Sequence, residues 1–99
     1  MATHSNEMLI PPAVASDREA FEIIRIWISG GQQHVSVNPR VWDDPAAWGM
    51  MLVDLARHIA DAYQQIDRMK SAAALERIKL GLDAEWNSPP DTPSGSLLA

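Results

Sequence analysis

The sequence contains no cysteine, and its 8 lysine and arginine residues are outnumbered by 13 aspartate and glutamate residues. Without cysteine there is no disulfide framework, no thiolate nucleophile and no cysteine-based zinc site. With a formal net charge of -5, the chain lacks the clustered cations that nucleic-acid phosphates and anionic lipids attract. We therefore expect neither a nucleic acid nor a membrane among its partners.

Long apolar runs are also missing, because no window offers the ~20 apolar residues that a membrane-spanning helix requires. Residues 1–7 are polar, and Pro11 and Pro12 interrupt the short apolar stretch that follows, so we expect no signal peptide. A chain of 99 residues holds one domain at most. These features favour a small, acidic, cytoplasmic protein of bacterial type.

The chain divides into three parts by composition. Residues 1–18 show no sustained period and predict an irregular N-terminal arm, although its apolar segment 8–10 could lie on the body of the protein. Residues 19–86 carry the regular patterns and predict a single domain. Residues 87–99 are rich in proline, serine and glycine, which is typical of a disordered tail.

A β-hairpin is predicted between residues 19 and 38. Residues 21–28 are rich in β-branched and aromatic side chains, and Gly30-Gly31 suits a two-residue turn with positive φ. Counting from that turn pairs Ile26 with Val35, and it divides the hairpin into two faces. One face is apolar and is expected to meet the core, and the other carries Ile23, Arg25, Trp27, His34 and Ser36.

Two helices are predicted after the hairpin. Asp43 and Asp44 precede Pro45, a combination that favours a helix start. An apolar stripe then runs along one side of the predicted helix, and a break is expected between residues 67 and 71, where Ser71 could cap a second helix ending near residue 86. A single bent helix from 45 to 86 is the alternative. The stripe comprises Trp48, Leu52, Leu55, Ile59, Ala62 and Ile66.

The predicted fold is therefore α+β, with an N-terminal hairpin packed on one long amphipathic helix, a second C-terminal helix and flexible termini. One helix covers only one face of a hairpin, and both strands would be edges with unpaired backbone groups. A region of this size also has a small core. We therefore expect a homodimer with a two-fold axis. The alternative is a monomer in which the arm or the second helix covers the exposed side.

Two clusters of polar residues were considered as sites. His34, Trp27, Arg25 and Ser36 share the outer face of the predicted hairpin, where imidazole, guanidinium and indole groups could bind a small molecule or anion. The alternative is that Trp27 and His34 are a cross-strand pair that packs at an interface and binds no ligand. Asp54, His58 and Asp61 lie on one helix face, but the interleaved Arg57 favours ordinary surface pairs. We therefore expect no metal site, no cofactor and no identifiable catalytic residue.

Three segments carry a resemblance to a known family: IWISGGQQHVSVNPRVWDDPAAWG, MMLVDLARHIADAY and GLDAEW. They resemble a family of small bacterial proteins classed as a domain of unknown function, with Gly-Gly-x-x-His-Val-Ser and Trp-Asp-Asp-Pro-Ala-Ala-Trp-Gly signatures. The resemblance spans residues 21–86 and implies a compact α+β domain. It implies no activity. The matching positions are Gly30, Gly31, His34, Val35, Ser36, Trp42, Asp43, Asp44, Pro45, Ala46, Ala47, Trp48, Gly49, Asp83, Glu85 and Trp86.

The sequence thus supports two functional hypotheses. The first is a homodimeric structural or protein-interaction module, which could also bind another protein. The second is a small-molecule or anion-binding protein, and conceivably an enzyme, that uses the outer hairpin face around His34. The absence of any strong catalytic motif favours the first hypothesis.

Overall fold

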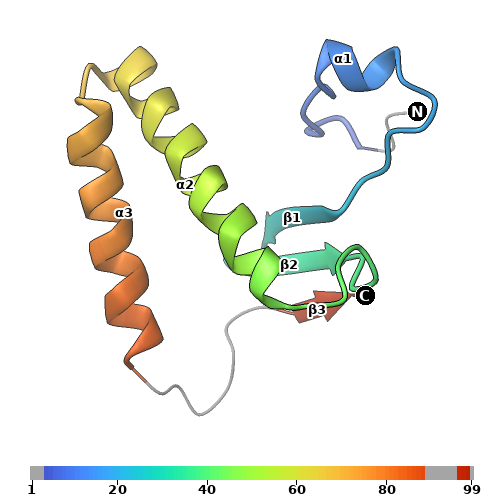
Figure 1. Ribbon diagram of the computed structural model, residues 1–99. Coiled ribbons are helices and arrows are strands. Elements are labelled where there is room, and N and C mark those ends of the chain that lie inside the picture. The colour runs from blue at the N-terminus through green and yellow to red at the C-terminus, as the bar shows by residue number, and fades with distance from the viewer. Residues whose placement is uncertain (1–3, 89–95, 99) are drawn as a thin grey trace.

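The computed structural model describes residues 4–88 and 96–98 of the 99-residue chain, and it consists of a small sheet and a pair of helices (Figure 1). The hairpin strands are β1 (Ile24–Ser29) and β2 (Gln32–Val37), and the helices are α2 (Ala46–Asp67) and α3 (Ser71–Trp86). The predicted α+β class, a hairpin followed by one long and one shorter helix, is confirmed. Two short elements, α1 (Pro12–Ala15) and β3 (Ser96–Leu98), complete the described fold.

The hairpin has the register that the paired glycines predict. Gly30 and Gly31 have φ of 61° and 72°, which is the left-handed conformation that glycine adopts without steric cost. Ile26 consequently pairs with Val35, and Trp27 pairs with His34. Because alternate residues point to opposite faces, the predicted division of the hairpin into an apolar face and a polar face follows from this register.

Helix α2 begins where the acidic and proline residues predict. The carboxylate of Asp44 accepts a hydrogen bond of 3.0 Å from the amide of Ala46, which satisfies one of the free donors of the first turn. The ring of Trp42, just before the helix, makes an edge-to-face contact with Trp48 at a centroid distance of 5.0 Å. The entry into the helix is therefore fixed by a polar contact and an aromatic contact.

Two separate helices form, so the alternative of one bent helix is wrong. Helix α2 ends at Asp67, and Arg68 turns the chain with a left-handed φ of 61°. Ser71 is the first residue of α3 instead of its cap, and its hydroxyl donates a 2.6 Å hydrogen bond to the carboxylate of Asp61. The amide of Ser71 also donates to Gln64 Oε1 at 2.8 Å, so the start of α3 is tied to the last turns of α2.

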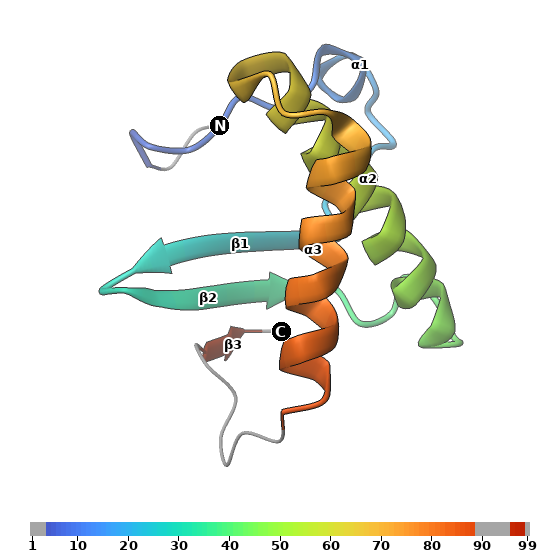
Figure 2. The same cartoon turned by 90° about the vertical axis from the view of Figure 1, so that its left-hand side faces the viewer.

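The packing between elements differs from the prediction. In the described part of the chain, β1 contacts β2, β2 contacts β3, and α2 contacts α3, but the hairpin does not pack on α2. The sheet lies on the opposite side of α2 from α3, and the hairpin points away from both helices (Figures 1 and 2). The expected packing of the hairpin on the long helix is therefore not made within one chain.

The described residues bury almost no large side chain. Ala60 of α2 and Ala74 of α3 are the buried apolar residues, with 0% and 3% of their surface exposed. These alanines lie on contacting helices, where small side chains allow close approach. Most of the predicted apolar stripe remains exposed, including Ile66, at 78%. The other large exposed members of the stripe are Leu52, Leu55 and Ile59.

The two ends of the chain contain structure that the sequence analysis did not predict. Helix α1 forms a single turn within the predicted irregular arm. Strand β3, within the predicted tail, pairs in parallel with β2, so that β2 is the central strand of a three-stranded sheet. The predictions of an arm at 1–18, a tail at 87–99 and flexible termini otherwise fall partly on residues 1–3, 89–95 and 99, which lie outside the described residues.

Candidate functional site

The candidate site is the polar face of the hairpin, where the register places Arg25 and Trp27 of β1 beside Ser36 and His34 of β2. All four residues predicted from the sequence therefore lie on one face. His34 is partly buried, and its Nε2 donates a 3.2 Å hydrogen bond to the carbonyl of Ser29 near the turn. Ser36 is exposed. Whether this face binds a ligand remains a prediction.

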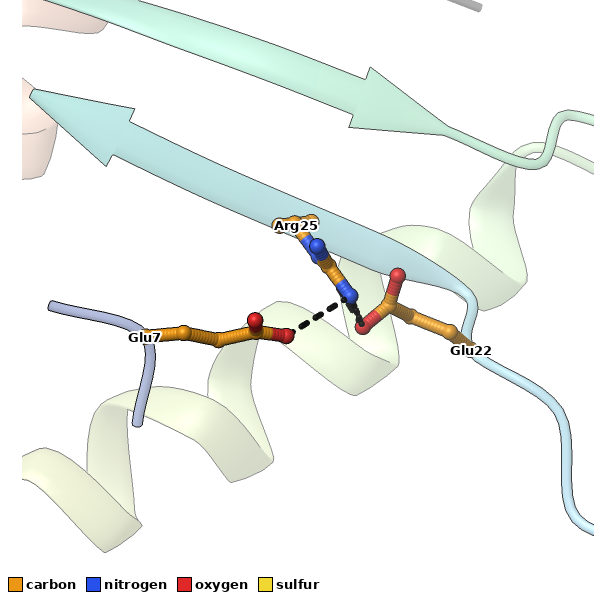
Figure 3. A network of polar contacts seen from close by, with 3 residues as sticks. All are labelled: Glu7, Glu22 and Arg25. Carbon is orange, nitrogen blue, oxygen red and sulfur yellow. Dashed lines mark hydrogen bonds and ion pairs between the residues drawn. The ribbon is translucent and has the colours of Figure 1, made fainter. Parts of the chain in front are cut away.

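Arg25 is held by two carboxylates (Figure 3). Its Nη2 lies 3.1 Å from Glu22 Oε2 and 3.3 Å from Glu7 Oε1, and its Nε also donates to Glu22 at 3.2 Å. The hydrogen bond and charge of Glu22, with a smaller effect of Glu7, raise the pKa of Arg25 above its ordinary value. Because two carboxylates face one guanidinium, the cluster carries a net negative charge and Arg25 is not a free cation for an anionic ligand.

Trp27 is covered by the N-terminal arm of the same chain. The ring of His4 lies 5.0 Å from the ring of Trp27, centroid to centroid, with an angle of 55° between the planes. Glu7, on the same arm, is largely buried against Arg25, with 16% of its side chain exposed. The arm therefore contacts the polar face through His4 and Glu7, whereas Met8 and Leu9 remain 89% and 97% exposed.

The roles of His4, Glu7 and Glu22 are not among the predictions from sequence. The apolar segment 8–10 is the part of the arm expected to lie on the body, but polar side chains of the arm make the contacts instead. No periodic signal marks them, since Glu7 and Arg25 are far apart in the sequence. Glu22 was accessible from sequence, because its position three residues before Arg25 is a spacing at which an ion pair can form.

A shallow hollow of about 240 Å³ lies between the arm and β1. This volume is below the roughly 300–1,000 Å³ that is usual for small-molecule sites. Both apolar and polar side chains line it, and it runs beside β1 rather than over His34 or Ser36. Its lining residues are Asn6, Glu7, Met8, Ile10 and Glu22 together with residues 24–27.

Two carboxylates of α2, those of Asp54 and Asp61, are engaged in local contacts. Asp54 Oδ1 lies 3.3 Å from Arg57 Nη1, and Asp61 accepts the hydrogen bond from Ser71. Among residues 4–88 and 96–98, no three histidine, aspartate or glutamate side chains are grouped closely enough to hold a metal ion. Within the same residues, none of the helices has the length and apolarity needed to cross a bilayer.

Comparison with known proteins identifies the family. A family model described as "Domain of unknown function (DUF5076)" matches residues 7–90. The chain belongs to the DUF5076 family. This finding supports the resemblance to a family of unknown function, although the two signature motifs are not themselves tested. No curated protein matches the sequence.

A solved structure is similar to this DUF5076 chain over nearly its whole length. It is described as a "putative pyruvate dehydrogenase from the photosynthetic bacterium Rhodopseudomonas palustrus CGA009". The two chains share 33% sequence identity and superpose with a TM-score of 0.71, and the match covers 96% of each chain. The likeness therefore extends over both the hairpin and the helix pair.

Proposed function

We propose that this DUF5076 protein is a homodimeric structural or protein-interaction module that associates through the apolar surface of its helix pair. The observation that carries the proposal is the exposed stripe of α2, which includes Leu52, Ile59 and Ile66. Full burial of one such side chain stabilises a fold by roughly 1.5–3 kcal/mol. A monomer forgoes the part of that stabilisation that belongs to the surface still exposed, and a second copy would recover it.

The total surface of the chain supports the same proposal. The chain exposes 8960 Å², whereas a compact monomer of 10.9 kDa exposes about 5,600 Å². Its radius of gyration is 15.5 Å, against about 13 Å for a compact domain of this length. A stable dimer of ordinary size buries about 800 Å² on each partner. The excess surface is more than such an interface needs.

The alternative, a small-molecule or anion site around His34, has less support. The guanidinium of Arg25 is already paired with two carboxylates, and one side of Trp27 is occupied by His4. The structural neighbour is described as a "putative pyruvate dehydrogenase", and that description names no residue that acts. The cytoplasmic location and the bacterial origin expected from the sequence stay predictions.

The test is the mass of the wild-type protein by light scattering after size-exclusion chromatography, measured over a wide range of concentrations. We expect about twice the chain mass of 10.9 kDa. The double variant Ile59→Glu, Ile66→Glu places charges on the stripe and should elute as a monomer. The control Gln65→Glu adds one negative charge at an exposed polar position of α2 and should remain dimeric. A wild-type monomer at the highest concentration would overturn the proposal.

A further inference from the structure

Strand β1 has a free edge in the described sheet. The strand order is β1-β2-β3, so β1 has a hydrogen-bonded neighbour on one side only (Figure 2). In an antiparallel pair, the backbone groups of successive residues point alternately toward and away from the partner strand. The amide of Asn38 donates to the carbonyl of Ile23, which fixes this alternation. The backbone groups of Ile24, Ile26 and Ile28 therefore point away from β2.

We propose that this edge pairs with β1 of a second copy, antiparallel and with Ile26 on the two-fold axis, to give one continuous six-stranded sheet in the dimer. The inference deepens the proposed homodimer, on which it rests, by adding a second contact surface to the helix face and giving that contact a register. An unpaired edge is a template for another strand, and a two-fold axis requires that strand to be the same one. Three residues on each chain would then exchange six backbone hydrogen bonds.

The sequence of β1 is self-complementary about Ile26. In this register Ile26 faces Ile26 of the partner subunit, and Ile24 faces Ile28 of the partner subunit. These pairs place isoleucines on the apolar face, where cross-strand contacts between branched side chains are favourable. On the other face, Arg25 lies opposite Trp27 of the partner subunit, so that no like charges are opposed.

Neighbouring registers are less favourable. A shift of two residues in one direction places Arg25 opposite Arg25 of the partner subunit, and like charges in directly opposed positions are destabilising. A shift in the other direction places Trp27 opposite Trp27 of the partner subunit and moves Ile24 opposite the turn. The register centred on Ile26 thus pairs the most isoleucines and avoids opposed like charges.

Exposed apolar side chains flank the free edge of β1. The hollow between the arm and β1 is lined by Ile24 and Ile26 on the strand side and by Met8 and Ile10 on the arm side. Met8 is 89% exposed, Ile10 is 57% exposed, and Ile28 further along the strand is 73% exposed. A partner strand along this edge would cover apolar side chains that a single chain leaves in water.

The experiment uses the absence of cysteine from the chain, so that one introduced thiol is unique. The variant Ile26→Cys places two thiols opposite each other across the proposed axis, where the Cα atoms of a hydrogen-bonded pair lie about 5.5 Å apart. We expect a disulfide-linked dimer after mild oxidation, visible by electrophoresis without reductant. A short bis-thiol crosslinker should give the same product.

Two matched variants act as controls. Ile24→Cys and Ile28→Cys each place their own two thiols about 13 Å apart, so neither variant alone should form a disulfide. Mixing these two variants should give a linked heterodimer, because position 24 faces position 28 of the partner subunit. Equal cross-linking of all three variants would reveal non-specific collision and overturn the proposal.

The outcomes separate this inference from the proposed function. If Ile26→Cys does not cross-link while light scattering still shows a dimer, the edge pairing is overturned and the helix-face dimer stands. If Trp27→Cys cross-links in place of Ile26→Cys, the register is overturned. If the wild-type protein is monomeric, both the inference and the proposed function are overturned.

Discussion

At the scale of single residues, the two turn glycines determine which side chains share a face. Gly30 and Gly31 both have positive φ, and neither has another atom within 4 Å of where a Cβ would be. A side chain at either position would therefore strain the backbone conformation without clashing with a neighbouring residue. Because the turn has two residues, every pairing in the hairpin follows from it, including the juxtaposition of Trp27 and His34.

Replacing glycine by alanine should lower stability at the turn and raise it within a helix. We expect Gly31→Ala to lower the free energy of unfolding by about 1–2 kcal/mol, because an L-residue is strained in the left-handed region. Gly81→Ala, in α3 with open space around it, should raise the free energy of unfolding by about 1 kcal/mol. Chemical denaturation of both variants checks this, and equal effects of one sign would contradict the turn geometry.

At the scale of elements, α2 and α3 contact each other through small side chains. Ala60 and Ala74 are the buried residues of the pair, and the hydrogen bonds of Ser71 to Asp61 and Gln64 connect the helices where the chain turns. Larger residues of both helices remain partly or largely exposed. The helix pair is therefore held by close approach of the backbones and by polar contacts more than by an extensive apolar core.

A larger side chain between the helices should separate them. Ala60→Leu adds volume at a fully buried position, and we expect a loss of about 1–3 kcal/mol in the free energy of unfolding from overpacking. The control Ala72→Leu makes the same change at an exposed position of α3 and should change stability by less than ~0.5 kcal/mol. Circular dichroism during thermal unfolding measures both. A neutral Ala60→Leu would show that the helices are not closely packed there.

The parts of the structure that the sequence could predict depend on local signals. The glycine pair predicted the hairpin register, and Asp44 with Pro45 predicted the start of α2. The contact of Glu7 with Arg25 was not predictable, because it joins distant polar residues without a periodic pattern. The apolar stripe was recognised, but the pattern does not say whether its partner is the same chain or a second copy. For that reason the hairpin was wrongly placed on α2.

At the scale of the whole molecule, a single copy leaves many large apolar side chains exposed to water. Exposed apolar side chains occur on the arm, on β1, along α2 and at the end of α3, where Trp86 is 82% exposed. In the candidate site, the sequence placed the four residues on one face, but the neutralisation of Arg25 by two carboxylates weakens the case for an anion site. The balance of these observations favours self-association over ligand binding.

Thermal stability should therefore depend on protein concentration. If folding and dimerisation are linked, mass action raises the melting temperature as the concentration rises, whereas a monomer melts at a constant temperature. Calorimetry over a hundredfold range of concentration measures this shift, and the double variant Ile59→Glu, Ile66→Glu should abolish it. A melting temperature of the wild type that does not change with concentration would contradict linkage between folding and association.

The contacts between elements have a consequence for how the protein forms. Strands β1 and β2 are neighbours along the chain, and so are helices α2 and α3, so each pair closes over a short stretch of sequence. Short closures are fast, and both pairs can arise soon after synthesis. In the proposed dimer, assembly then requires the encounter of two such chains, and the slowest phase of refolding would be second order in protein concentration.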